Sequence, residues 1–298
     1  MDTPIHTYAP LPSEFHIRIL VLEPAPTSTA PLHGTFELAR LTEIEGTYEA
    51  ISYTWGKPIM SQSLYCDDKT QIRITQSLDD ALRRVRFTGH RRRLWADAVC
   101  IDQSNTKDKG VQIPRMKKIF RSAKKVLAWL GPGGNGEEEA INLLVPADVP
   151  GQSAESDDPQ LSEDETKFAS HTVQQDAASV QKLVELPFFS RMWIIQEIVF
   201  NMDVLLLCGD AEISWQRFRT GLSIYKFCFP ITTTLLERLD AIAVVSSLWE
   251  INNMVDLPLA SDVHHLEVSS DKGIIDLLTK FASYECTDPR DRIFALYS

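Results

Sequence analysis

The sequence lacks the features of a secreted, membrane-spanning or metal-binding chain. Its five cysteines are odd in number, widely spaced and without a CxxC pair, which argues against a disulfide framework. No apolar run reaches the roughly 20 residues of a membrane helix. The first 14 residues have neither the basic nor the apolar part of a signal peptide, and no HExxH motif or close Cys/His cluster is present. We therefore expect a cytoplasmic protein with reduced thiols, no membrane segment and no metal. The cysteines are Cys66, Cys100, Cys208, Cys228 and Cys286.

The sequence also has little positive charge. The 298 residues carry a net charge of −11, with a pI of about 5.1, so bulk electrostatics do not favour nucleic acid or an anionic membrane as a partner. Residues 83–93, RRVRFTGHRRR, are the exception. A solvated helix end and loop explains this stretch better than a phosphate-binding surface.

Strand and helix patterns alternate along the chain, and 44% of the residues are hydrophobic, enough for a large core. Several strand patterns are apolar on both faces, which indicates a sheet covered by helices on both sides. We therefore predict an α/β fold with a mainly parallel sheet flanked by helices, an N-terminal β-hairpin addition and a C-terminal helical extension. The predicted strands are 15–24, 34–43, 48–56, 62–66, 71–75, 92–103, 124–131 and 203–209. The predicted helices are 78–86, 113–121, 137–145, 174–186, 191–200, 214–227, 233–251 and 273–285.

The predicted organisation has three parts. Residues 1–47 form a lead-in with strands packed on the core, residues 48–212 form the α/β core, and residues 213–298 form a helical extension of the same domain. Residues 146–166 are acidic, rich in Pro, Ser and Asp, and free of basic residues. This composition predicts a mobile insertion between two helices.

Three motifs have structural explanations that outweigh the functional ones. The loop GPGGNG (131–136) lacks the order of a nucleotide-binding loop and is best explained as a strand–helix connection. Cys100 has no histidine nearby in sequence, so we expect a packed small residue rather than a nucleophile. In DPRDR (288–292), helix initiation accounts for Asp288 as N-cap, Pro289 as first residue and Asp291 as third. The sequence contains neither a P-loop nor a GxSxG motif.

Polar and aromatic side chains gather where predicted strands end. Asp97, Asp102 and Gln103 belong to one such end, and Tyr53 and Trp55 to another. Ligands of open α/β sheets bind beyond the carboxyl ends of the strands, so these residues can line one cleft. Loop and helix capping explains the two aspartates equally well.

The stretch RMWIIQEIVF (191–200) contains a glutamate in an otherwise apolar helix pattern. Trp193 and Glu197 are four residues apart and share a helix face. Burying Glu197 is costly unless it is paired, for instance with Arg191 or Arg115, or faces a cavity. Composition leaves an ion pair and a functional role equally open.

Five blocks occur in an order that resembles the fungal heterokaryon incompatibility (HET) domain. They are YEAISYTWG, the run from LWADAVCIDQ to LAWLG, FFSRMWIIQEIVF, VLLLCGDAEISW and DPRDRIFALYS. The resemblance covers roughly residues 48–298 and departs from the family's spacing at the acidic insertion. The chain stops inside the last block, which predicts a fragment of a longer protein. The family implies a role in non-self recognition that ends in cell death.

A weaker resemblance connects the same blocks to TIR domains. YEAISYTWG is similar to a TIR opening strand, and WIIQE to the helix in which Trp precedes the catalytic Glu by four residues. TIR domains have a flavodoxin-like parallel sheet, and many cleave NAD at the nicotinamide glycosidic bond. Carried over, Glu197 is the catalytic carboxylate. Substrate-binding positions are then Tyr53, Trp55, Gly56, Asp97, Asp102, Gln103, Trp193 and Gln196. Structural motif positions are Arg191, Asp288, Arg290 and Asp291.

This resemblance implies no tightly bound cofactor, with NAD or NADP as substrate. One ionised carboxylate suffices, because the nicotinamide ring is positively charged and leaves neutral, so no general acid is required. Trp193 can stack on an aromatic ring or exclude water.

Three functions stay open from the sequence: an NAD-cleaving enzyme, a non-catalytic module that signals by self-association, and a nucleotide-binding regulator without turnover. The expected partners are a second copy of the chain and an incompatibility partner protein. An open cleft at Glu197 favours the enzyme. A Glu197 bonded to a buried arginine favours a structural role.

Overall fold

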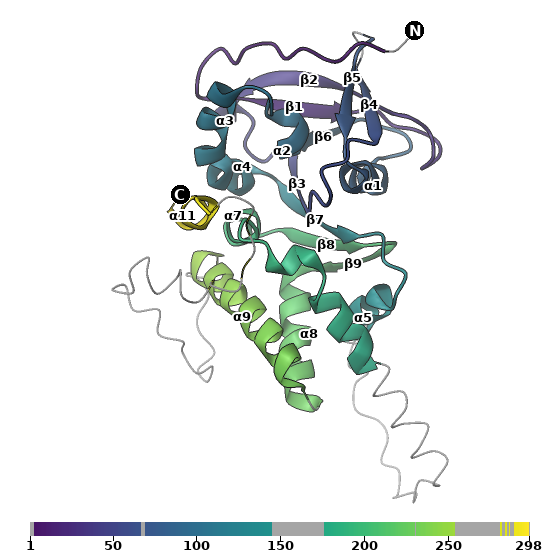
Figure 1. The fold of residues 1–298 in the computed structure, drawn as a ribbon, viewed down its shortest axis with the longest axis vertical. Coiled ribbons are helices and arrows are strands. Elements are labelled where there is room, and N and C mark those ends of the chain that lie inside the picture. The colour runs from purple at the N-terminus through teal and green to yellow at the C-terminus, as the bar shows by residue number, and fades with distance from the viewer. Residues whose placement is uncertain are drawn as a thin grey trace, which may run out of the picture.

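The computed structural model shows one nine-stranded sheet with helices around it (Figure 1). It describes residues 3–66, 69–144, 176–229, 231–253 and 289–297, together with residues 281, 284 and 286. The strand order is β5-β4-β2-β1-β6-β3-β7-β8-β9. The strands are β1 (His16–Leu22), β2 (Leu32–Arg40), β3 (Glu49–Tyr53), β4 (Gln62–Cys66), β5 (Gln71–Ile74), β6 (Arg92–Trp95), β7 (Lys125–Gly131), β8 (Val204–Cys208) and β9 (Ala211–Ser214).

The centre of the sheet is parallel and its edges are antiparallel. Strands β6, β3, β7 and β8 pair in parallel, with Glu49 opposite Lys125 and Tyr53 opposite Trp129 in the β3–β7 register. Strands β3, β7 and β8 are largely apolar on both faces, so they need helices on both sides. The α/β prediction with a mainly parallel sheet is confirmed for this centre.

The N-terminal hairpin belongs to the same sheet. Strands β4 and β5 form the predicted antiparallel hairpin, and β4 pairs in parallel with β2. Strand β1 then joins β2 to β6 with antiparallel pairing on both sides. The hairpin is therefore one edge of a mixed sheet and not an addition beside it, because the open edge of β2 supplies the backbone groups that β4 needs.

Most helices lie near their predicted positions. Thr75 caps α1, since its side-chain oxygen accepts from the amide of Leu78. The helices are α1 (Gln76–Val85), α2 (Asp97–Cys100), α3 (Thr106–Gln112), α4 (Met116–Ser122), α5 (Glu137–Leu144), α7 (Ile194–Ile198), α8 (Trp215–Cys228), α9 (Thr233–Asn253) and α11 (Asp291–Tyr297). Residues 176–184 are also helical. Three 3₁₀ turns are η1 (Leu41–Glu43), η2 (Ile113–Arg115) and η3 (Pro187–Ser190).

Two predicted elements near the candidate site are wrong in extent. The strand predicted over 92–103 ends at Trp95, and residues 97–100 turn into α2. The helix predicted over 191–200 contains only the five residues of α7. Both segments are continuously apolar, and such a run does not distinguish a buried strand from buried helical turns.

Two further predictions concern the C-terminal part. Helix α11 begins at Asp291, so Asp291 is its first residue rather than its third, and Pro289 and Arg290 form the turn before it. The acidic insertion 146–166, Asp288, and the predicted helix 273–285 apart from Phe281 and Tyr284 lie outside the described residues.

Helices α8 and α9 lie side by side beneath β8 and β9, and α9 reaches the segment after α7 (Figure 1). The indole of Trp249 donates to the carbonyl of Asn201, and the side-chain amide of Asn253 donates to the carbonyl of Val199. The amide of Asn201 in turn donates to the carbonyls of Phe120 and Ala123. Among the residues that the structure describes, no helix has the length and apolar character needed to cross a bilayer.

A buried ion pair fastens the N-terminal segment to the sheet. Arg18 on β1 donates to the Asp108 carboxylate at 2.7 Å and to the carbonyls of Ala9 and Cys100. The same carboxylate accepts from the amide of Asp102. The side chains of Arg18 and Asp108 are only 4% and 6% exposed, so each depends on the other for compensation of its charge.

We expect Asp108→Ala to lower the free energy of unfolding by about 3–5 kcal/mol, because it leaves the Arg18 charge buried and unpaired. Urea denaturation measures this change. Asp240→Ala is the control, since it removes an exposed pair with Lys226 and should cost less than about 1 kcal/mol. Equal losses in the two variants would contradict a special role for the Arg18–Asp108 pair.

Candidate functional site

The site begins at the carboxyl end of β3. Its last residues, Ser52 and Tyr53, are almost fully buried, and Trp55 is partly buried beyond the strand. Gly56 follows with φ +69°, a conformation that favours glycine and turns the chain away from the sheet. This end of the central parallel strands is where ligands bind in open α/β sheets.

Glu197 reaches β3 from α7. The serine hydroxyl of Ser52 donates to Oε2 of Glu197 at 2.6 Å, a contact between residues 145 apart in the chain. The backbone amide of Glu197 donates to the carbonyl of Trp193, so the predicted one-turn relation of these two residues is present. Gln196, on the same short helix, is fully buried.

Arg191 forms an ion pair with the same Glu197 carboxylate. Its Nη2 donates to Oε1 at 2.8 Å and its Nη1 to Oε2 at 3.1 Å, a two-pronged ion pair. The Glu197 side chain is 3% exposed, whereas that of Arg191 is 17% exposed. Glu197 is thus bonded to a largely buried arginine, the arrangement that favours a structural role.

Asp97 is a second carboxylate of this cluster. It begins α2 instead of lying within a strand, and its Oδ1 accepts from the amide of Ala98 at 2.8 Å. Its Oδ2 accepts from the indole of Trp55 at 2.9 Å. Gln103 donates to the Asp97 carbonyl and so holds the turn of α2 closed.

The electrostatics of the cluster are perturbed. Burial raises the pKa of Asp97 to about 6, and the negative charge of Glu197 adds to this effect while Arg191 opposes it. Burial, and next the charge of Asp97, raise the pKa of Tyr53 well above 10. A carboxylate whose pKa is raised toward neutrality by its surroundings is typical of functional sites.

Other predicted site residues are placed differently. Asp102 accepts from the amide and hydroxyl of Ser104, so it shapes its own loop. Trp193 is partly buried, and its indole donates to Asp291 at 3.1 Å. Arg290 is exposed in the turn before α11. Of the predicted site residues, the structure brings together Tyr53, Trp55, Asp97, Gln103, Arg191 and Glu197, whereas the carboxylate of Asp102 bonds within its own loop. The catalytic and substrate-binding roles of these residues stay predictions.

Ser52 belongs to this cluster, and the sequence prediction missed it. It lies between Ile51 and Tyr53 on a buried strand, and its hydroxyl bridges β3 to the carboxylate of Glu197. A serine inside an apolar strand must find a buried partner, and that requirement was the available signal.

The other motifs behave as structural elements. In the loop 131–136, the carboxylate of Glu137 accepts from the amide of Asn135, and Glu138 accepts from the amide of Asp210. Acidic side chains at these amides disfavour a phosphate. Burial raises the pKa of Cys100 to about 12, which fits a packed thiol. All five cysteines are free.

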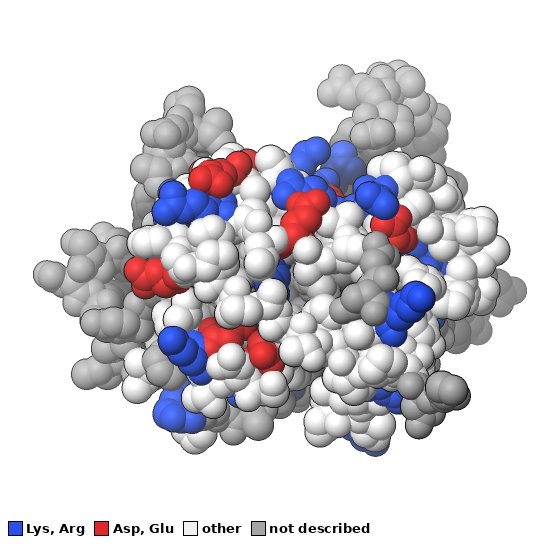
Figure 2. All heavy atoms as spheres, turned by 90° about the horizontal axis from the view of Figure 1, so that it is seen from above, with Lys and Arg blue, Asp and Glu red and all other residues white. Residues whose placement is uncertain are grey.

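The arginines of the basic stretch 83–93 bond to other parts of the protein. Arg83 donates to the carbonyls of Ser28 and Ala30, Arg92 pairs with Glu49, and Arg93 pairs with Glu37. Figure 2 shows acidic and basic side chains interspersed on one face of the molecule. Within the described ranges, no group of three or more His, Cys, Asp or Glu side chains is placed to hold a metal ion.

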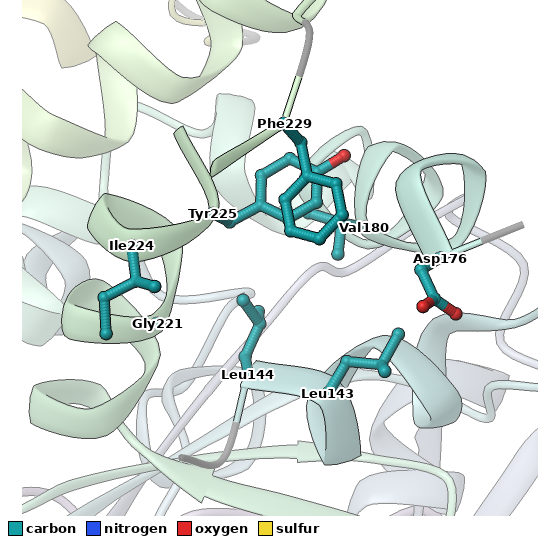
Figure 3. A pocket seen from close by; sticks show the side chains of 8 residues that line it. All are labelled: Leu143, Leu144, Asp176, Val180, Gly221, Ile224, Tyr225 and Phe229. Atoms are coloured by element: carbon teal, nitrogen blue, oxygen red, sulfur yellow. The ribbon is translucent and has the colours of Figure 1, made fainter. Parts of the chain in front are cut away.

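Two cavities in the described part of the chain are lined by residues other than those around Glu197. One of about 150 Å³ is apolar and lies between α5, residues 176–184 and α8, with Tyr225 and Phe229 on one wall (Figure 3). The other, of about 330 Å³, is open to solvent and is lined by Asn135, Glu137, Lys182, Glu185, Leu186 and Pro187. Neither is lined by a residue of the Glu197 cluster.

Comparison with known proteins gives two findings. Residues 48–197 match the family model described as heterokaryon incompatibility protein (HET). The chain is also 27% identical over 257 residues to heterokaryon incompatibility protein 6, OR allele, of Neurospora crassa. The alignment covers 76% of this chain and 38% of that protein, so the chain spans well under half of this relative's length. No solved structure matches, so the TIR-like or flavodoxin-like form of the fold stays a prediction.

The perturbed carboxylate predicts a pH dependence of stability. Because the folded state holds the Asp97 proton up to about pH 6 and the unfolded state releases it near 3.8, the contribution of Asp97 to stability is full below pH 3.8 and falls between about pH 4 and 6. The stability difference between wild type and Asp97→Asn should change across this window and be flat above it. Chemical denaturation at several pH values measures it, and a constant difference would contradict the assignment.

Proposed function

Because this chain belongs to the heterokaryon incompatibility family, we propose that it is a domain of a fungal incompatibility protein that triggers cell death, and that it acts by hydrolysing NAD or NADP at the nicotinamide glycosidic bond. The substrate is bound transiently and no resident cofactor is involved. A second copy of the chain and an incompatibility partner protein are the proposed partners. The five free thiols support the proposed cytoplasmic location.

Two neighbouring carboxylates, the buried Glu197 and the half-buried Asp97, carry this proposal. Glu197 and Asp97 influence each other at the carboxyl end of β3, where the indole of Trp55 donates to Asp97 and the buried Tyr53 lies close enough to feel both charges. Aromatic walls with few polar groups suit a flat ring such as nicotinamide. A carboxylate that faces the ribose stabilises positive charge as it develops on the sugar.

The proposed reaction needs one negative charge and a water molecule. The bond between ribose C1′ and the nicotinamide nitrogen breaks, and its electron pair returns to the ring, which leaves neutral. The Glu197 carboxylate stabilises the oxocarbenium-like sugar. Water then adds to C1′ and loses a proton to solvent, so the products are ADP-ribose, nicotinamide and a proton.

Arg191 must release Glu197 before substrate can reach it. The guanidinium is more exposed than the carboxylate and lies toward the surface of the pair. The pyrophosphate of a dinucleotide can replace Glu197 as the partner of Arg191, because a phosphate accepts two hydrogen bonds from a guanidinium in the same way as a carboxylate. The proposed site therefore opens when Arg191 exchanges Glu197 for the substrate's phosphates.

A second function is favoured by the same ion pair in its observed form. With Glu197 fully bonded and 3% exposed, the chain can act as a non-catalytic module that signals by self-association. Glu197 then only fastens α7 to β3.

The test is nicotinamide release from NAD and NADP by the purified protein, measured over a range of protein concentrations that permits self-association. We expect Glu197→Gln to lower the rate by about a hundredfold or more. Glu250→Gln is the matched control, because it removes an ion-pair carboxylate from α9 that is remote in sequence from the cluster, and it should leave the rate unchanged.

Circular dichroism of each variant establishes that it is folded. Equal rates for wild type and Glu197→Gln would show that Glu197 is not the catalytic carboxylate. Absence of release by wild type at every concentration would favour the self-association module.

A further inference from the structure

A hydrogen bond joins the site helix to the C-terminal helix. The indole Nε1 of Trp193 donates to Oδ2 of Asp291 at 3.1 Å, although the two residues are 98 positions apart. Helix α11, which begins at Asp291, packs against α7 (Figure 1). The acceptor is a carboxylate, so this is a charge-assisted bond of the stronger kind.

Trp193 is the residue from which α7 starts. Its carbonyl accepts from the amides of Gln196 and Glu197 at 3.0 and 3.2 Å, while its side chain supplies no cap to the helix. A helix of five residues has almost no stability of its own. The position of Glu197 therefore depends on what holds Trp193 in place, as well as on its own bonds to Ser52 and Arg191.

Helix α11 is itself anchored to the body of the protein. Arg292 donates to the carbonyl of Tyr284, and the hydroxyl of Tyr284 donates to the carbonyl of Ala241 on α9. Tyr284 is buried and packs edge-on against Phe281. Asp291 thus offers Trp193 a fixed acceptor.

We infer that Asp291 is a positioning residue, which fixes the Trp193 indole and through it the start of the helix that carries Glu197. The bond itself is independent of the reaction, whereas its effect on turnover rests on the proposed function. A role of Asp291 confined to starting α11 is the competing explanation, since an acidic residue in the first turn favours a helix.

The indole N–H signals of ¹⁵N-labelled protein separate the two explanations. The chain has six tryptophans, and the signal of Trp193 is the one lost in Trp193→Phe. We expect Asp291→Ala to shift this signal and to speed exchange of its proton with water about tenfold, the change for loss of a hydrogen bond worth roughly 1.4 kcal/mol. Asp291→Asn keeps an oxygen acceptor and should restore most of the protection.

The Trp193 signal is compared with that of a control variant on α9. Asp240→Ala removes an exposed carboxylate of α9 and should leave the Trp193 signal unchanged. If Asp291→Ala leaves the signal unchanged in folded protein, or if Asp291→Asn behaves as Asp291→Ala does, the positioning role is wrong. Should Asp291→Ala fail to fold, the comparison of wild type with Asp291→Asn decides, with unchanged protection supporting the role and complete loss of protection overturning it.

The rate of nicotinamide release gives a second test, independent of the indole signals. If the protein releases nicotinamide, Asp291→Ala should slow release in wild type and have no further effect in Trp193→Phe. An equal slowing in both backgrounds would overturn the route through Trp193. If wild type releases no nicotinamide, the proposed function fails while the indole signals still decide the role of Asp291.

Discussion

The ion pair between Arg191 and Glu197 is the contact on which the geometry of the candidate site depends. Together with the hydroxyl of Ser52, it satisfies both oxygens of a carboxylate that is otherwise closed to water. Removing one member of a buried pair typically costs about 3–5 kcal/mol, because the other charge is left without compensation. The side chains of Ser52, Arg191 and Glu197 therefore fix α7 and the segment before it relative to strand β3.

The same segment is held from its other end by backbone hydrogen bonds. Trp249 and Asn253 of α9 bind carbonyls that α7 leaves free at its end, and Asn201 binds those at the end of α4. Buried carbonyls need such partners. A five-residue helix becomes a fixed element here because α4, α9 and α11 each contact it. The helices after β9 thus contribute directly to the position of Glu197.

The sequence indicated much of this arrangement because its signals are local. Alternating and apolar runs predicted the central strands, and the four-residue spacing of Trp193 and Glu197 placed them one turn apart. Periodicity does not report whether Glu197 faces a cavity or Arg191, six residues before it, because that depends on the path of the chain before α7. The contacts of Ser52 with Glu197 and of Trp193 with Asp291 span 145 and 98 residues, and no local pattern specifies either.

The charge count of the cluster bears on the choice between the two functions. Glu197 pairs with the guanidinium of Arg191, which also acts on the nearby Asp97, so ionisation of both carboxylates leaves one excess negative charge in the cluster. Burial raises the pKa of Asp97 first, and the charge of Glu197 raises it further. A nicotinamide ring brings one positive charge, which compensates that excess on binding and removes the compensation when the neutral ring leaves. A self-association module has no use for the excess charge, so burying it only lowers stability. Charged groups that lower stability and hold no other part of the fold together are typical of sites that act on a ligand. This is the physical reason to favour the NAD-cleaving enzyme over the self-association module.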